Sequence, residues 1–137
     1  MKEIITYLNF DGNCREAMTF YAKGLGLDLQ MSSFADMPGE RMKEAGDRIA
    51  HARLNKGTTP FLMASDTMPG TPFQAGNNFS VSVTCESLEE IERMFPAVAE
   101  GGTITMPLGD QFWGARFGML ADRFGVRWMF SFEHPKK

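Results

Sequence analysis

The chain has 137 residues, of which 43% are hydrophobic and 23% are charged, which suits one compact domain or two small halves that share a core. A net charge of −3 at pH 7 and a pI near 5.4 argue against a surface for nucleic acid or for anionic membranes. No apolar run approaches the roughly 20 residues that a membrane-spanning helix needs, and the first residues lack a signal-peptide pattern. We therefore expect a cytoplasmic protein.

The two cysteines, Cys14 and Cys85, are too few for a disulfide scaffold. Both stand at predicted helix starts, where the pKa of a thiol can fall and make it reactive. The alternative, which we favour, is that both are small, partly buried free thiols.

The first half of the chain predicts one helix and four strands. The strands are expected at residues 4–10, 27–34, 48–55 and 60–64. Before the helix, Asn13 and Glu16 have the spacing of a capping box, and apolar residues at helical intervals follow until Gly24 or Gly26. The polar residues 35–47 contain glycine and proline, so they predict a long loop or flap that is poorly ordered without a ligand.

After a linker at residues 65–77, the same order of elements starts again. Ser87 and Glu90 repeat the capping box, and a Gly-Gly pair stops the helix that follows. The strands are expected at residues 78–84 and 103–108, and on both sides of a tight turn at residues 122–125 within the aromatic-rich stretch 111–130. The two helix caps lie 74 positions apart (87 − 13 = 74), which indicates an internal repeat.

Each half therefore predicts the order strand, helix, strand, strand, strand, and neither half can bury its apolar face alone. We expect an α+β fold with two βαβββ repeats, at about residues 3–66 and 77–132, in a single domain of residues 1–137. The repeats should form a curved mixed sheet with the helices outside and a cavity on the concave face. Strand edges left on each half would be closed by a second chain, so we expect a homodimer.

Several short motifs along the chain have the order found in a known superfamily. They are Asn9-Phe10-Asp11-Gly12-Asn13, Ala17, Phe20-Tyr21, Phe112-Trp113-Gly114, Phe117-Gly118, and Asp122-Arg123-Phe124-Gly125-Val126 with Trp128. The combination covers essentially the whole chain and resembles the vicinal-oxygen-chelate superfamily, which includes glyoxalase I, bleomycin-resistance proteins and extradiol dioxygenases. The resemblance is closest to the PhnB-like branch and implies a glyoxalase/bleomycin-resistance-like homodimer of largely unassigned role. Some PhnB-like proteins carry a 3-demethylubiquinone methyltransferase label, but this chain has no glycine-rich dinucleotide-type loop after a strand.

The resemblance also implies four positions for ligands of a divalent metal, one on each of four strands facing the cavity. Carried over to this chain, these positions fall at Thr6, at His51, near Phe79 and at Met129. Only His51 is a good ligand, whereas a hard or borderline metal needs several N or O donors. A soft metal would want more sulfur than Met129 alone supplies. We therefore expect no metal and no other cofactor.

The residues that remain in the expected cavity suggest a site for an anion. Strand alternation places His51 and Arg53 on one face. Arg53 suits a carboxylate or phosphate, and His51, the best catalytic candidate, suits a general base or a hydrogen-bond donor. The alternative is that His51 is a satisfied sheet histidine and that Arg53 reaches solvent or a dimer partner. The candidate ligand-binding residues are Thr6, His51, Arg53, Trp113, Arg127 and Met129.

Other residues near these candidates are expected to be structural. His134 should be exposed and idle in the C-terminal tail, and Asp110 should order a glycine-containing turn. Most aromatic residues of the stretch 111–130 should lie in the core, with Trp128 under a helix and Trp113 at the cavity rim.

Two classes of function fit these observations. The first is a metal-independent protein that binds a small anionic or aromatic molecule, as bleomycin-resistance proteins do. The second is a glyoxalase-type isomerase, lyase or oxygenase that uses His51 with a divalent metal. The missing metal ligands favour the first class, and a regulatory interaction protein with a vestigial cavity is a third, weaker alternative.

Overall fold

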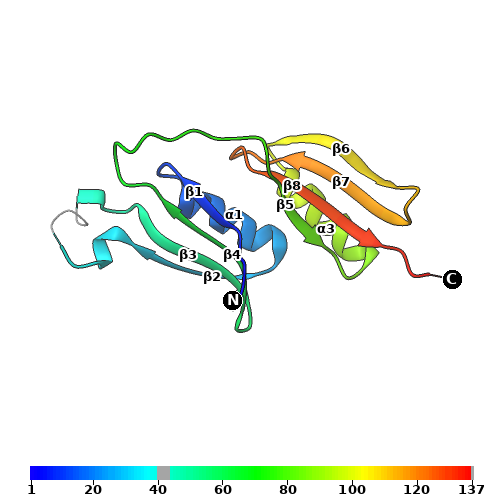
Figure 1. Cartoon of the computed structure of the whole chain (residues 1–137), viewed down its shortest axis with the longest axis horizontal. Helices are drawn as coiled ribbons and strands as arrows, with labels where there is room; N and C mark the ends of the chain where they lie inside the picture. Colours follow the sequence, from blue (N-terminus) through cyan, green and yellow to red (C-terminus); the bar gives the residue numbers. More distant parts are fainter. Residues whose placement is uncertain (40–43, 137) are drawn as a thin grey trace. The chain divides into compact units, whose positions relative to one another are not determined.

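The computed structural model describes residues 1–39 and 44–136 of the chain. By its internal contacts the chain divides into two compact units, Met1–Gln74 and Ala75–Lys137, and each is described by itself (Figure 1). None of the described helices has the length and the apolar character that crossing a membrane requires.

Unit one contains one long helix and a mixed four-stranded sheet. Its elements are β1 (Tyr7–Phe10), α1 (Cys14–Leu25), β2 (Asp28–Ser33), the short 3₁₀ helix η1 (Phe34–Asp36), β3 (Ile49–Lys56) and β4 (Thr59–Asp66). The sheet order is β1-β4-β3-β2, in which β1 is parallel to β4 and the other neighbours are antiparallel. This is a βαβββ unit, as the sequence predicts.

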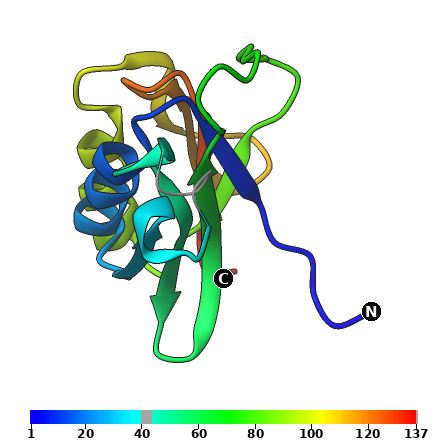
Figure 2. The ribbon, with the colours of Figure 1, turned by 90° about the vertical axis from the view of Figure 1, so that its left-hand side faces the viewer.

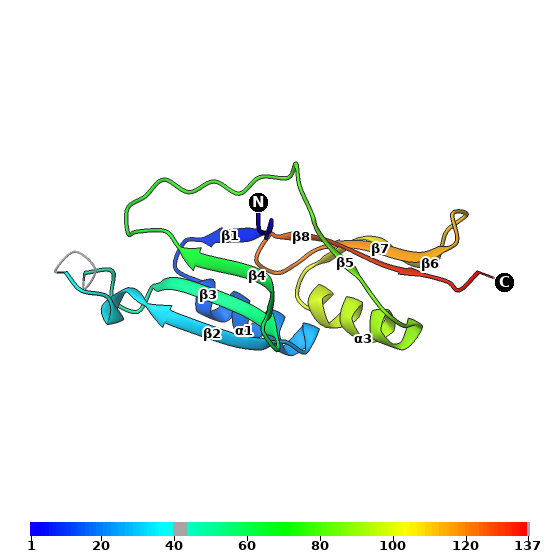
Figure 3. The same cartoon turned by 60° about the horizontal axis from the view of Figure 1, so that its bottom comes forward.

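Helix α1 covers one face of this sheet, and none of the helices described for unit one covers the other face, called here the helix-free face (Figures 2 and 3). The apolar stripe of α1 packs there because its side chains recur at helical spacing, while alternate residues of the strands point toward it. The buried side chains of this core include Ala17, Met18, Tyr21, Leu8, Phe10, Ala52, Leu54 and Ala64. The opposite, helix-free face carries partly exposed and polar residues.

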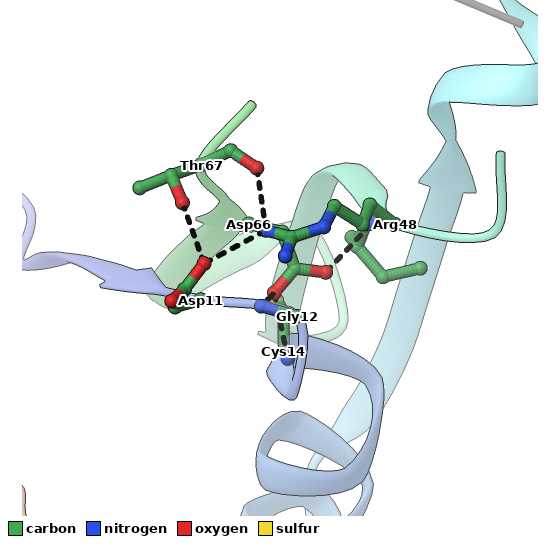
Figure 4. Close-up of polar contacts among 7 residues, drawn as sticks. Asp11, Gly12, Cys14, Arg48, Asp66 and Thr67 are labelled. Atoms are coloured by element: carbon green, nitrogen blue, oxygen red, sulfur yellow. Dashed lines mark hydrogen bonds and ion pairs between the residues drawn. The ribbon is translucent and has the colours of Figure 1, made fainter. Parts of the chain in front are cut away.

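The start of α1 is capped by a distant residue. Asn13 makes no side-chain capping bond, so the capping box predicted with Glu16 is wrong. Instead, Asp66 at the end of β4 accepts hydrogen bonds through Oδ1 from the backbone N–H groups of Gly12 (2.8 Å) and Cys14 (3.0 Å), as Figure 4 shows. A buried carboxylate thus satisfies helix donors that the local sequence leaves open. The predicted helix stop is confirmed at Gly26, which adopts the left-handed conformation.

Unit two repeats the arrangement. Its elements are β5 (Val81–Thr84), α3 (Leu88–Ala99), β6 (Thr103–Asp110), β7 (Ala115–Ala121) and β8 (Arg127–Glu133). The sheet order is β5-β8-β7-β6, again with one parallel pair, β5 and β8. Helix α3 covers one face, where Phe95 meets Phe130 edge to face and Trp128 stacks on Phe130. The predicted burial of Trp128 beneath a helix is confirmed, since it is 1% exposed.

The Ser87 cap of α3 is confirmed, because its hydroxyl accepts from the Glu90 N–H at 3.1 Å. The Glu90 carboxylate reaches the N–H of Glu86 rather than that of Ser87, so the box is displaced by one residue. The predicted tight turn at residues 122–125 also forms, and Asp122 orders it by accepting from the N–H groups of Phe124 and Val126.

The predicted α+β class and the two βαβββ repeats are confirmed, as two four-stranded sheets. The first strands of both units are shorter than expected: β1 begins at Tyr7 and β5 at Val81, so Thr6 and Phe79 precede their strands. Of the predicted flap at residues 35–47, the first residues belong to η1, and residues 40–43 lie outside the described part of the chain. The single curved sheet, its cavity and the single domain stay predictions.

Candidate functional site

The helix-free face of unit one brings together side chains from all four of its strands. Strand register places Tyr7 beside Met63, Met63 beside Arg53, and Arg53 beside Gln30, in one row across β1, β4, β3 and β2. His51 lies two residues before Arg53 on the same face of β3, and it pairs with Ser32 on β2. The buried Ala52 between them points toward α1. The face is therefore mixed in character, with cationic, amide, aromatic and thioether groups.

His51 forms a pair with Tyr7. The Tyr7 hydroxyl lies 3.2 Å from Nδ1 of His51, and the two rings are 5.8 Å apart between centroids. His51 is exposed, and this contact engages Nδ1 of its ring. Sequence reasoning did not select Tyr7, although it lies on the predicted first strand next to Thr6. The contact also supplies the hydrogen bond that is expected if His51 is a satisfied sheet histidine without a functional role.

Arg53 is held on one side only. Its Nη2 donates to Gln30 Oε1 at 2.8 Å, and the same oxygen lies 3.4 Å from Nδ2 of Asn55. Among the described residues, Nε of Arg53 is buried and has no hydrogen-bond partner. Arg116 Nε has the same status but contacts the Glu92 carboxylate, so its charge is compensated. Among the described residues, no carboxylate forms an ion pair with Arg53.

The remaining predicted residues lie in different places. Thr6 is exposed ahead of β1, and its carbonyl accepts from the Met63 N–H. Arg127 and Met129 are partly exposed on the helix-free face of β8 in unit two. Trp113 is 53% exposed before the start of β7, with its ring edge-on to Phe117.

One aromatic expectation is wrong. Most aromatic residues of the stretch 111–130 were expected in the core, but only Trp128 and Phe130 of them are buried. Phe112 is 97% exposed, because residues 111–114 form the short connection between β6 and β7. Its ring contacts only the edge of Trp113 among the described aromatic rings. Within residues 111–114, Gly114 is the one residue of a type that favours turns.

The described residues contain no cluster of the usual metal-ligating side chains. No three His, Cys, Asp or Glu side chains come together among residues 1–39 and 44–136. Near His51 the described neighbours are the phenol of Tyr7 and the hydroxyl of Ser32, which do not make the multidentate N and O set that such ions need.

The two thiols are buried and unreactive in character. Burial, followed by the charge of Asp66, raises the pKa of Cys14 to about 12, and burial, followed by the charge of Glu90, raises the pKa of Cys85 to about 11. The interpretation of both cysteines as buried structural thiols is confirmed.

His134 is not idle, contrary to expectation. Its Nε2 lies 2.7 Å from Asp110 Oδ1, and its backbone N–H donates to the carbonyl of Gly114. The side-chain hydrogen bond with His134 is the main cause that lowers the pKa of Asp110. Asp110 ends β6 rather than ordering a turn, and it also lies 3.6 Å from Arg116. The pair ties the C-terminal segment to the β6–β7 connection.

Comparison with known proteins identifies the family. Residues 2–131 match the family model described as 3-demethylubiquinone-9 3-methyltransferase. The chain belongs to this PhnB-like family. It is 34% identical to protein YjdN of Escherichia coli K12, over 91% of each chain. The PhnB-like chain is also 46% identical in sequence to protein PA1353 from Pseudomonas aeruginosa, whose crystal structure is known. The match covers 98% of this chain and 100% of the PA1353 chain, with a TM-score of 0.87.

A Bacillus cereus PhnB protein is 31% identical to this PhnB-like chain, with 96% and 99% of the two chains covered and a TM-score of 0.75. A glyoxalase/bleomycin resistance protein/dioxygenase family enzyme from Burkholderia phytofirmans shares the fold alone, at 14% identity and a TM-score of 0.62 over 94% and 98% of the chains. The predicted PhnB-like branch and glyoxalase/bleomycin-resistance-like fold are therefore confirmed.

Proposed function

We propose that this PhnB-like protein binds a small anionic or aromatic molecule without the help of a metal. The observation that carries the proposal is Arg53, whose guanidinium lies on a helix-free sheet face, is held only by the neutral Gln30 and has a buried Nε without a partner. A carboxylate or phosphate would complete its hydrogen bonds and neutralise its charge. His51, oriented by Tyr7, would add a donor beside it.

The remaining predicted residues extend the proposed ligand contacts. Thr6 precedes the strand that carries Tyr7, and within unit two Trp113, Arg127 and Met129 offer stacking, charge and soft apolar surface to a ligand of that unit. A divalent-metal enzyme that uses His51 is the second candidate, and what favours it is the exposure of that histidine. Methyl transfer, which the family description names, would instead need a site for a methyl donor.

Matched ligands distinguish these functions. Benzoate should raise the melting temperature of the wild type more than benzamide, because only the carboxylate can pair with Arg53. In Arg53→Met, benzoate binding by calorimetry should weaken at least tenfold, which is about 1.4 kcal/mol. Arg15→Met, at an exposed position on α1, is the matched control and should bind as the wild type. Equal binding by Arg53→Met and the wild type would refute the anion site.

The same calorimetry tests the alternatives. Titration with Ni²⁺, Zn²⁺ and Mn²⁺ should give no stoichiometric binding, and binding that His51→Ala abolishes would establish the metal enzyme instead. S-adenosylmethionine should leave the melting temperature unchanged, and a clear increase would favour the methyl-transfer activity.

A further inference from the structure

Three methionines form a row across the sheet of unit two. Met106 on β6 is directly opposite Met119 on β7, and Met119 is directly opposite Met129 on β8. All three side chains are partly exposed. Their strand neighbours Gly118, Leu120, Trp128 and Phe130 are buried on the side that α3 covers, so the row lies on the helix-free face.

Two β-bulges place Met106 in this row. Alternation along β6 would put Ile104, Met106 and Leu108 on one face, and Leu108 does approach Gly118 on the helix side. The register shifts between Ile104 and Met106, and again between Met106 and Gly109. Each bulge reverses the face of the residues beyond it, so Met106 alone is turned toward Met119. A sequence pattern that assumes regular alternation cannot detect the row.

We infer that the row is a site for a soft monovalent cation of the Cu(I) or Ag(I) class. Thioether sulfur is a neutral, polarizable ligand that selects Cu(I) over Zn²⁺, Mg²⁺ or Mn²⁺. The sequence offered only Met129 at this place, and the register now adds two further sulfur atoms beside it. This site shares Met129 with the proposed ligand contacts but uses no residue of unit one, so it does not depend on Arg53 or on the anion-binding function.

The spacing of the row suits convergence on one ion. Directly opposite residues have Cβ atoms roughly 4.5–5.5 Å apart, so the outer two methionines lie about 10 Å apart, two strand spacings across the sheet. Three rotatable bonds let Met106 and Met129 lean toward Met119, which occupies the centre. Along β8, Arg127 precedes Met129 by two residues and Glu133 follows it by four, so opposite charges flank the row on the same face. A singly charged ion is repelled by Arg127 half as strongly as a divalent one.

Methionine methyl resonances give the decisive test. Full-length protein labelled with ¹³C in its eleven methionine methyl groups would be titrated with silver nitrate in chloride-free buffer. One equivalent of Ag⁺ should shift and saturate the signals of Met106, Met119 and Met129, and leave those of Met37 and Met68 in place. The inference is overturned if no methyl signal moves, or if all eleven move in proportion to their exposure.

Variants separate the row from the two buried thiols, which also bind soft metals. Met119→Leu keeps the apolar volume and should weaken Ag⁺ affinity at least tenfold, whereas Met37→Leu in an exposed segment should leave it unchanged. Undiminished affinity in Met119→Leu would mean capture by Cys14 or Cys85 and would refute the site. If circular dichroism shows that Met119→Leu does not fold, the methyl signal shifts of the wild type in the Ag⁺ titration decide whether the site exists. Arg53→Met should bind Ag⁺ normally, so the two proposals can fail separately.

Discussion

Asp66 and Asp122 are buried carboxylates, 4% and 5% exposed, that each bind three N–H groups. Asp66 accepts from Gly12 and Cys14 through Oδ1 and from Ile49 through Oδ2, which joins the turn after β1, the start of α1 and the start of β3. Asp122 accepts from two backbone N–H groups of its turn and from Nε1 of Trp128. Such bonds offset the cost of burying the charge.

Replacing Asp66 by asparagine should destabilise unit one by about 3 kcal/mol, because an amide NH₂ would face a buried N–H group and the charge-assisted bonds would be lost. Urea unfolding followed by far-ultraviolet circular dichroism measures the change. The matched control is Asp11→Asn in the same cluster (Figure 4), which removes an ion pair with Arg48 from a half-exposed carboxylate. That control should cost at most about 1 kcal/mol. Equal effects of the two variants would contradict the capping role.

The Asp66 cluster also shows which contacts of single residues could not be predicted from the sequence. Asp66 is 54 residues from Gly12 in the chain and 17 from Ile49. A local rule finds a capping partner three residues away, so it selected Glu16 for Asn13 and succeeded only at Ser87. Asp122 was predictable because two of its acceptor bonds reach residues two and four positions ahead. Tyr7 and Gln30 were missed for the same reason as Asp66, since strand register defines their contacts.

At the scale of elements, α3 approaches β7 closely at Gly118. A Cβ atom at this position would lie 2.8 Å from Phe95 Cε2 and 2.9 Å from Leu108 Cδ2. Both distances are shorter than van der Waals contact, and the Phe95 ring is held against Phe130. The missing side chain therefore lets the helix seat its largest buried residue on the sheet.

Gly118→Ala should lower the free energy of unfolding by about 1–3 kcal/mol, because the added methyl group overpacks this contact. Trp128 fluorescence during urea unfolding is a suitable measurement, since its ring stacks on Phe130. Gly76→Ala is the control: its added Cβ would meet nothing closer than 3.5 Å. The packing argument is wrong if Gly118→Ala is as stable as the wild type.

Helices were easier to predict than strands in this chain. The apolar spacing of α1 and α3 is regular, and the two helices end one and two residues before the glycines expected to stop them, Gly26 and Gly101. Edge strands β1 and β5 begin three residues later than predicted, because β-forming residues continue into the segments that precede them. The bulges of β6 include Pro107 and Gly109, which an assumption of regular alternation overlooks, so the methionine row was not predicted. The aromatic residues of the stretch 111–130 were placed in the core by residue type alone.

At the scale of the whole molecule, the internal repeat is clearest in its first elements. The first strands begin 74 residues apart (81 − 7 = 74), and so do the helices (88 − 14 = 74). The third strands begin 66 residues apart (115 − 49 = 66), because unit one has the longer segment between its second and third strands. The candidate site residues also differ between the two units: Arg53 and His51 belong to unit one, whereas the methionine row belongs to unit two. One duplicated framework thus carries two chemically different faces.

Each unit also exposes apolar surface and strand edges that argue for a second copy. In unit one Ile4 and Phe61 are 86% and 53% exposed, and in unit two Phe79 and Phe112 are 62% and 97% exposed. The edge strands β1 and β5 contain no charged residue or proline, whereas the edges β2 and β6 carry Asp28 and Pro107. Unguarded edges and contiguous apolar surface are features that proteins usually cover.

We therefore predict a homodimer at micromolar concentration. Sedimentation equilibrium should return twice the chain mass of 15.3 kDa, and the mass should hold at high salt because apolar contacts are not screened. Dilution of fluorescently labelled protein into the nanomolar range would give the dissociation constant of the dimer. A mass of one chain at micromolar concentration would contradict the prediction, and the exposed side chains would then have to be covered within the chain itself. A mass above two chains would indicate open-ended pairing of the unguarded edges rather than a closed, symmetric contact.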